Sequence, residues 1–204
     1  MTRQSCLACR RPLPACYCAL VKPFASRPRF IILIQPREAK HRLGTGRMAH
    51  LCLANSLLIE GVDFSRHEQV EGIIRDPNAF CVLLYPQTTA INLSNLSRNE
   101  RLALTPPSKE LVVFVPDGTW KTVRKMVRSS QNLNRLTRVS FNPPRPSMYR
   151  IRKQPHPKLC CTLEAIHHVI DLFAAESPPG TVKSHDNLLE VFQFTISRQL
   201  SYRP

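Results

Sequence analysis

The stretch that decides the fold is Leu111-Val112-Val113-Phe114-Val115-Pro116-Asp117-Gly118-Thr119-Trp120. Its first half is an unbroken apolar run rich in β-branched residues, which predicts a buried strand. Two similar apolar runs, at residues 30–34 and 81–85, are also ended by a nearby proline. Buried strands without polar alternation are typical of parallel sheets, whose two faces are both covered.

Helical periodicity fills the intervals between these strands. Strands that alternate with helices predict an α/β fold with a mostly parallel sheet and helices on both faces. The predicted helices cover residues 45–60, starting near Thr45 and stopped by Gly61, then 95–104, a stretch from Trp120 onward, 162–176 and 187–200, with a short strand around 138–141.

The exits of the strands are the expected place for a ligand, because parallel sheets bind ligands beyond the carboxyl ends of their strands. This rule selects Tyr85-Pro86-Gln87, the segment from Pro116 to Trp120, and the segment from Leu159 to Glu164. The alternative for each exit is ordinary turn chemistry, to which proline and glycine also belong.

The charge of the chain indicates a polyanionic partner. Lys and Arg number 29 against 14 Asp and Glu, which gives a net charge of +15 with neutral histidines. Such a field favours nucleic acid or an acidic membrane surface. No run of 18 apolar residues predicts a membrane span, and the first residues lack the apolar core of a secretory signal. We therefore expect a cytoplasmic protein without a membrane anchor.

Four cysteines near the start predict a zinc site. Cys6 and Cys9 are separated by two residues, and Cys16 and Cys18 by one. Four thiolates within so short a segment suit a structural Zn²⁺ ion, which takes four soft ligands in a tetrahedron. Disulfides and redox chemistry are the alternatives, the first disfavoured in a reducing compartment. The expected organisation is a zinc module over residues 1–29 and a catalytic domain over residues 30–204.

Asp117 is the only acidic residue between Leu111 and Leu163, a stretch with eleven Lys or Arg. A lone carboxylate in a field suited to phosphates would repel an anionic substrate, so it predicts a chemical role. The alternative is that Asp117 only caps the following helix, where Asp is common.

The cations around Asp117 predict an RNA-binding surface. Those from Lys121 to Arg138 have no acidic partner in the sequence, and Tyr149 precedes a second basic block, as in contacts to single-stranded RNA. A solvated helix face is the alternative for the first group. The predicted RNA contacts are Arg37, Arg42, Thr45, Arg47, Lys121, Arg124, Lys125, Arg128, Arg150, Arg152 and Lys153. We interpret His167-His168, on an apolar helix, as a packed or partly exposed pair in preference to a ligand site.

Several of these motifs together resemble the DTW-domain family of tRNA-uridine aminocarboxypropyltransferases. Asp117-Gly118-Thr119-Trp120 matches the motif that names the family. The other matching segments follow in the family's order: the four cysteines, Thr45-Gly46-Arg47, Leu84-Tyr85-Pro86, Tyr149 to Pro155 and Thr162-Leu163-Glu164-Ala165. Two positions depart from it: Gly44 replaces a polar residue, and Cys161 replaces serine.

The resemblance implies a reaction and a fold. Such enzymes transfer the 3-amino-3-carboxypropyl group of S-adenosylmethionine to N3 of a tRNA uridine, in the variable loop for bacterial members, and release methylthioadenosine. The implied fold is SPOUT-like with a knotted C-terminal part. A noncatalytic zinc-containing RNA-binding protein and a SPOUT methyltransferase are the alternative functions. The partner is tRNA, and either a monomer or a homodimer is compatible with the sequence.

The resemblance also implies the roles of individual residues. Asp117 is the candidate base, and Glu164 either contacts the amino group of S-adenosylmethionine or caps the last helix. Two roles are open for Trp120: it stacks on a base or on the co-substrate, or it anchors its helix in the core. We favour the second role. The expected S-adenosylmethionine contacts are Leu84, Tyr85, Pro86, Val115, Pro116, Gly118, Thr119, Trp120, Leu159, Cys160, Cys161, Thr162 and Glu164.

Overall fold

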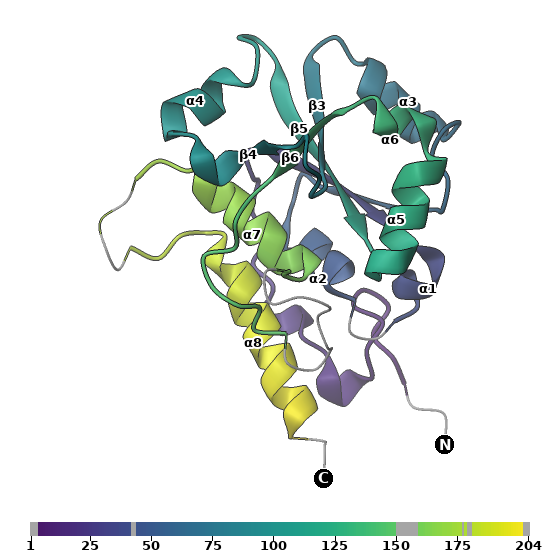
Figure 1. Ribbon diagram of the computed structural model, residues 1–204. Helices are drawn as coiled ribbons and strands as arrows, with labels where there is room; N and C mark the ends of the chain where they lie inside the picture. Colours follow the sequence, from purple (N-terminus) through teal and green to yellow (C-terminus); the bar gives the residue numbers. More distant parts are fainter. Residues whose placement is uncertain (1–3, 42–43, 150–158, 177, 179–180, 202–204) are drawn as a thin grey trace.

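The computed structural model describes residues 4–41, 44–149, 159–176, 178 and 181–201, and shows one parallel sheet with helices on both of its faces (Figure 1). The predicted α/β architecture is therefore confirmed. The strands are β1 (Arg29–Ile34), β2 (Leu57–Glu60), β3 (Ala79–Leu84), β4 (Ile91–Asn92), β5 (Glu110–Asp117) and β6 (Thr137–Ser140). The helices are α1 (Pro36–Ala39), α2 (Thr45–Cys52), α3 (Glu68–Arg75), α4 (Arg98–Ala103), α5 (Trp120–Ser129), α6 (Gln131–Asn134), α7 (Thr162–Phe173) and α8 (Asp186–Leu200), with short 3₁₀ turns at Leu13–Ala15, Cys18–Leu20 and Leu93–Asn95.

The strand order is β2-β1-β5-β3-β6-β4, and every neighbouring pair is parallel. The chain changes direction across the sheet after β2, after β4 and after β5. At each reversal the connection moves to the other face, as connections of uniform right-handedness require. Consequently α2, α7 and α8 cover one face, while α3, α5 and α6 cover the other.

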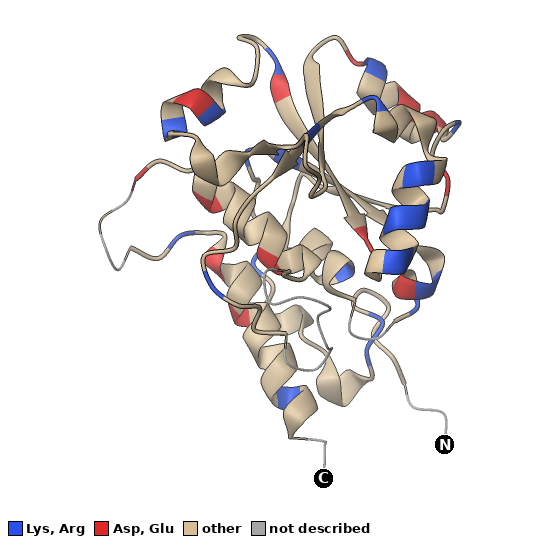
Figure 2. Cartoon of the chain, viewed as in Figure 1, with Lys and Arg blue, Asp and Glu red and all other residues tan. Residues whose placement is uncertain are grey.

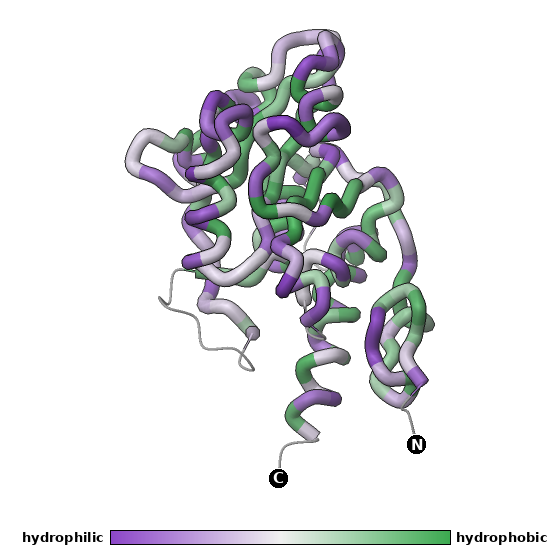
Figure 3. The backbone as a smooth tube through the Cα atoms, turned by 90° about the vertical axis from the view of Figure 1, so that its right-hand side faces the viewer, coloured by the Kyte–Doolittle hydropathy of each residue, from purple (hydrophilic) through white to green (hydrophobic). Residues whose placement is uncertain are grey.

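The alternation of side chains along β1 explains why its sequence is apolar throughout. Phe30 and Ile32 point into the core beneath α2, α7 and α8, whereas Ile31 and Leu33 point into the core beneath α3 and α5. All four side chains are fully buried, and burying each stabilises the fold by roughly 1.5–3 kcal/mol. Figure 3 shows these apolar strand segments inside a more polar outer layer.

The prediction of one helix over residues 45–60 is wrong in its second half. Helix α2 ends at Cys52, and residues 57–60 form the edge strand β2, which pairs along β1. Asn55 fixes the turn between them, because its side chain accepts a hydrogen bond from Ser26 N (3.0 Å) and donates one to Ser26 O (2.9 Å). Tertiary pairing thus overrides the helical pattern. The other predicted elements are present with shifted ends, and α3 was not predicted.

The segment that precedes β1 packs on the main core. Cys9 and Tyr17 are buried among the side chains of α2, α7 and α8. Asn187 on α8 accepts a hydrogen bond from Lys22 N and donates one to Leu20 O, both at 2.9 Å. Within the part of the chain that the structure describes, no helix is long and apolar enough to cross a bilayer.

Candidate functional site

A cavity of about 420 Å³ lies beyond the carboxyl ends of the strands. Its walls come from the exits of β3, β5 and β6, from the starts of α2 and α5, and from the segment leading into α7. Twelve of the thirteen residues predicted to contact the co-substrate line it: Leu84, Tyr85, Pro86, Val115, Pro116, Gly118, Thr119, Trp120, Leu159, Cys160, Cys161 and Thr162.

Asp117 lies on the wall of this cavity, at the last position of β5. Only 5% of its surface is exposed. Its carbonyl accepts a hydrogen bond from Gln35 N at 3.0 Å, which holds the exits of β1 and β5 together. Its carboxylate Oδ1 accepts a hydrogen bond from the hydroxyl of Thr162, the first residue of α7. The backbone of Asp117 is therefore held by Gln35, and its carboxylate is oriented by Thr162.

Three helix starts surround this carboxylate. Helix α5 begins three residues after Asp117, α7 begins at its partner Thr162, and α2 contributes Gly46, its second residue. A Cβ atom on Gly46 would lie 2.6 Å from Asp117 Oδ2, so only glycine allows so close an approach. Helix N-termini carry partial positive charge, which favours a negative group beside them. The helix starts thus give the carboxylate of Asp117 a positive local field.

Thr119 and Gly118 explain why the chain turns into α5 at this point. Thr119 caps the helix, its hydroxyl accepting a hydrogen bond from Thr122 N at 3.2 Å. A Cβ atom on Gly118 would lie 2.7 Å from the hydroxyl oxygen of Thr122. The cap is supplied by Thr119, so Asp117 is not the N-cap considered as the alternative to a chemical role.

Glu164 is the one predicted contact that does not line the cavity. It is the third residue of α7, and its carboxylate accepts a hydrogen bond from Cys161 N, the residue before the helix, at 2.9 Å. It also accepts from Met148 N at 2.7 Å and Ser147 Oγ at 2.6 Å. Of the two roles considered for Glu164, the structure places it in the capping geometry, where it ties the segment before Tyr149 to the start of α7.

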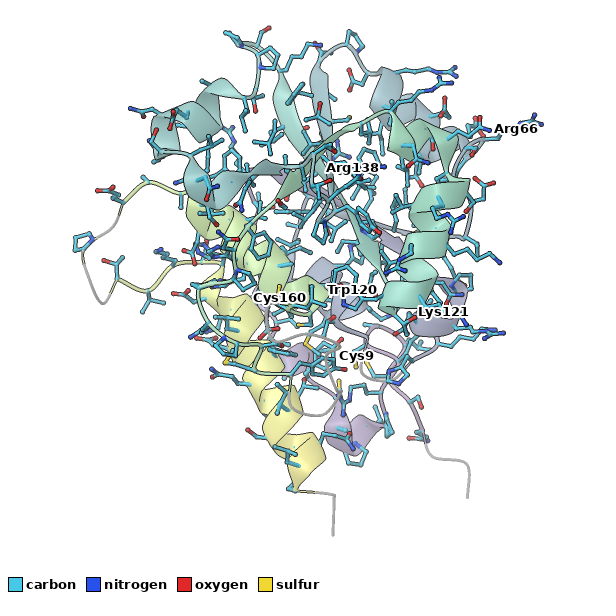
Figure 4. The ribbon with its side chains drawn as sticks, viewed as in Figure 1. Cys9, Arg66, Trp120, Lys121, Arg138 and Cys160 are labelled. Carbon is cyan, nitrogen blue, oxygen red and sulfur yellow. The ribbon has the colours of Figure 1, made fainter. Side chains whose placement is uncertain are left out.

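Trp120 does not anchor α5 in the core, contrary to the role that we favoured. Its side chain belongs to neither core cluster, and it lines the cavity in a half-buried position. Val123, Met126 and Val127 provide the anchor instead. Figure 4 shows Trp120 and Cys160 below the strand ends. An indole here has a free face toward the cavity space.

Glu38 is a site residue that the sequence reading missed. It follows β1 on the short helix α1, is only 8% exposed, and lines the same cavity as Asp117. Gln35 caps this helix by accepting a hydrogen bond from Arg37 N at 2.7 Å. The exit of β1 carries Pro36, as the exits of β3 and β5 carry Pro86 and Pro116, so the sequence marks this exit without showing that it meets Asp117.

Cys160 and Cys161 line this cavity, and burial keeps their thiols protonated. Burial raises the pKa of Cys160 to about 12, and it also raises the pKa of Cys161 well above its usual value. Both thiols are therefore neutral at physiological pH, when they are weak nucleophiles.

The predicted RNA contacts fall into two groups. Lys121, Arg124, Lys125 and Arg128 are exposed along one side of α5, the blue band in Figure 2, and Arg37 is exposed on α1. Thr45 is instead buried on the cavity wall, and Arg47 is half-buried, with its pKa lowered by burial. Arg42, Arg150, Arg152 and Lys153 lie outside the described residues.

The four N-terminal cysteines converge as predicted. Their four Sγ atoms all lie within 4.8 Å of one another. The Sγ atoms of Cys6 and Cys18 are 3.7 Å apart, and those of Cys9 and Cys16 are 3.6 Å apart. These separations exceed a disulfide bond of about 2.05 Å. They match the edge of about 3.8 Å of a tetrahedron with Zn–S distances of about 2.3 Å. The donor set therefore fits a metal ion bound by four thiolates.

Comparison with known proteins gives one family. Residues 3–200 match the DTW domain. A relative in Drosophila melanogaster, tRNA-uridine aminocarboxypropyltransferase 2, is 28% identical over 169 residues, which are 79% of this chain and 63% of the relative. A relative in Arabidopsis thaliana, tRNA-uridine aminocarboxypropyltransferase A, is 30% identical over 139 residues, 63% of this chain and 52% of the relative. The match thus spans about half to two thirds of these relatives' own length, and no solved structure matches.

Proposed function

We propose, since this chain belongs to the DTW-domain family, that it is a tRNA-uridine aminocarboxypropyltransferase. It would transfer the 3-amino-3-carboxypropyl group of S-adenosylmethionine to N3 of a tRNA uridine, in the variable loop, with release of methylthioadenosine. One observation carries this proposal: a buried carboxylate, Asp117, lies in the family's motif on the wall of a cavity where the strand exits meet.

The cavity suits S-adenosylmethionine in size and charge. Its volume of about 420 Å³ falls within the range of about 300–1,000 Å³ that is typical of small-molecule sites. Two buried carboxylates, Asp117 and Glu38, line it. A donor with a sulfonium and an ammonium group would be favoured beside them, because opposite charges attract more strongly in a partly buried site than in water. The backbone of the three exits would hold the adenine ring.

The bound donor supplies a sulfonium whose three carbons are all open to attack. In our proposal the chain decides which carbon reacts, since the one in line with uracil N3 is favoured by orientation. Asp117 takes the N3 proton while the bond between N3 and the aminocarboxypropyl carbon forms. The electron pair of the breaking carbon–sulfur bond stays on sulfur. Thr162 keeps Asp117 Oδ1 in place during this step through its hydrogen bond.

Trp120 and Glu38 would position the reactants. The half-buried indole of Trp120 faces the cavity and offers a surface on which a base stacks. Glu38 would bind the ammonium group of the donor, because its carboxylate lies on the same cavity wall as Asp117. This assignment predicts that Glu38→Gln raises the KM for S-adenosylmethionine more than it lowers kcat.

The exposed cations of α5 would hold the tRNA backbone. Lys121 both lines the cavity and continues the exposed face formed by Arg124, Lys125 and Arg128. Phosphates bound along this face would bring a uridine toward Trp120, at the start of the same helix. The cations would contribute affinity and register, while the cavity reads the base.

Three further assignments belong to the same proposal. The four cysteines would hold a structural Zn²⁺ ion in a module over residues 1–29, next to a catalytic domain over residues 30–204. The catalytic domain would be of the SPOUT type with a knotted C-terminal part, which the parallel sheet and the site at its carboxyl edge support. The free thiols of the chain are in keeping with a reducing cytoplasm.

The decisive experiment incubates purified protein with unmodified tRNA and S-adenosylmethionine labelled in its carboxyl group. We expect label in the RNA together with equimolar methylthioadenosine. Methyl label in the RNA with S-adenosylhomocysteine would instead indicate a methyltransferase. Tight tRNA binding without either product would indicate a noncatalytic RNA-binding protein, and both outcomes would overturn the proposal.

A further inference from the structure

A second group of metal-ligating side chains lies where α7 meets the start of α8. One potential ligand atom each from His167, His185 and Asp186 lies within 4.8 Å of the other two. His167 is on α7, while His185 and Asp186 open α8. Their side chains are 12%, 6% and 37% exposed, respectively, so the cluster is largely shielded from solvent. The sequence reading treated His167 only as part of a packed pair.

The hydrogen bonds around this cluster direct His167 and Asp186 at each other, while His185 Nε2 lies 3.0 Å from Asp171 Oδ1. Asp186 Oδ2 accepts a hydrogen bond from Lys183 N at 2.8 Å, which leaves Oδ1 directed at His167 Nε2, 3.3 Å away. On the other side of the same ring, His167 Nδ1 lies 3.4 Å from Asp171 Oδ2. A carboxylate behind the second nitrogen of a histidine is the usual arrangement around a metal-binding imidazole.

His167 lies between two carboxylates. Carboxylate oxygens face both of its ring nitrogens, yet a neutral imidazole has a single N–H to donate. In a neutral ring, one nitrogen lone pair would therefore face an oxygen lone pair. A cation between His167 Nε2 and Asp186 Oδ1 removes this repulsion, and a separation of 3.3 Å matches the edge of about 3.3 Å of a tetrahedron around Zn²⁺ with bonds of about 2.0 Å.

The charge of the cluster also favours a cation. Asp171 and Asp186 contribute two carboxylates, and Lys183 contributes one ammonium, whose Nζ lies 2.6 Å from Asp171 Oδ1. Apart from its imidazoles, the cluster therefore carries one net negative charge, inside a chain whose net charge is +15. Imidazole and carboxylate ligands suit Zn²⁺ and similar transition metals, while Mg²⁺ and Ca²⁺ prefer oxygen ligands alone.

We propose that His167, His185 and Asp186 form a second divalent-metal site of the zinc type, separate from the four cysteines and from the cavity that holds Asp117. Three protein ligands leave one position of a tetrahedral ion for a small ligand such as water. The site joins α7 to the first turn of α8 across the segment between them. It would thus fasten the C-terminal helix, whose Asn187 holds the N-terminal segment.

Metal stoichiometry of the full chain tests this proposal. Protein loaded with excess Zn²⁺ and desalted is analysed for zinc per chain, in the wild type, His185→Ala, Asp186→Asn and the control His41→Ala, which removes an exposed histidine. We expect about two equivalents in the wild type and the control, and about one in each cluster variant. Circular dichroism identifies folded preparations, and Asp186→Asn keeps the test valid if the histidine variant fails to fold.

A cobalt titration separates the two sites by their chemistry. Co²⁺ added to protein that already holds one Zn²⁺ should give weak visible bands without the strong near-ultraviolet absorption of thiolate ligands, and Asp186→Asn should abolish them. One zinc equivalent in the wild type, or two in folded Asp186→Asn, would overturn the proposal. In that case His167 would be a protonated member of a hydrogen-bonded network that joins the two helices.

Discussion

The cysteine cluster and the cavity around Asp117 are assembled in opposite ways. The four thiols come from 13 consecutive residues and meet through local turns, including a hydrogen bond from Arg10 N to Cys6 O. The cavity combines α1, the start of α2, the exits of β3, β5 and β6, and the start of α7, which are spread over more than 120 residues. A local site depends on its own ligands, whereas a dispersed site depends on how the whole sheet places its strands.

The largest expected effect is the loss of the local site. Cys9→Ser, or removal of the metal by a chelator, should lower Tm by roughly 10 °C or more, because Cys9 is only 3% exposed and belongs to the main core. Differential scanning calorimetry measures the shift. Cys81→Ser is the control, since this half-buried thiol lies outside the cluster. An unchanged Tm in metal-free protein would show that the cluster is independent of the core.

Loss of the carboxylate at the dispersed site should affect catalysis and leave the fold intact. Asp117→Asn is expected to lower kcat by about 10²-fold or more, the usual contribution of a general base. The hydrogen bond from Thr162 can still be accepted by the amide oxygen. Single-turnover transfer of labelled aminocarboxypropyl measures the effect, and Glu176→Gln, at an exposed position, is the control. Full activity in folded Asp117→Asn would remove the proposed base.

A smaller effect should follow from displacing the carboxylate without changing it. Gly46→Ala places a Cβ atom 2.6 Å from Asp117 Oδ2, so the carboxylate must move. We expect a loss of about 10- to 100-fold in kcat, as for other small misplacements of reacting groups. Gly72→Ala on α3 is the matched control, because its Cβ meets nothing within 4 Å. That control should stabilise the fold by about 0.5–1 kcal/mol and retain activity.

The smallest expected effect concerns the exposed face of α5. The double variant Arg124→Gln, Lys125→Gln should weaken tRNA binding and reduce the slope of log affinity against log salt by about 1.5–2, because two phosphate contacts are lost. Binding measured at several salt concentrations gives the slope. Lys109→Gln, an exposed lysine before β5, should leave it unchanged. An unchanged slope in the double variant would mean that this face is only solvated.

Prediction from the sequence succeeded where local pattern decides the structure. The runs in β1, β3 and β5 are apolar because both faces of the sheet are covered, and the exits follow from their prolines. The division between α2 and β2 could not be predicted, because the hydrogen bonds of Asn55 to Ser26 that end the helix join positions 29 residues apart. A helical pattern does not reveal such a partner.

The missed site residues have the same cause. Glu38 reaches the cavity only because β1 lies beside β5, so the exit of β1 meets Asp117. His167 becomes part of a cluster because the segment after α7 returns to place His185 and Asp186 beside it. Trp120 looked like a core residue because its spacing matches Val123 and Val127, yet its side chain lines the cavity at the strand exits. Pairing and docking of distant segments decided all three.

The central place of β5 bears on how the protein is made. This strand, residues 110–117, lies between β1 and β3, which are both synthesised well before it. Until β5 emerges from the ribosome, β1 and β3 lack their common neighbour and expose unpaired edges to other chains. Pairings between such distant segments also form slowly. Asp117 is the last residue of the strand that joins β1 to β3, so a chain interrupted before this strand carries neither a joined sheet nor the carboxylate. A nascent chain therefore acquires the Asp117 carboxylate only when β1 and β3 can pair with their common neighbour.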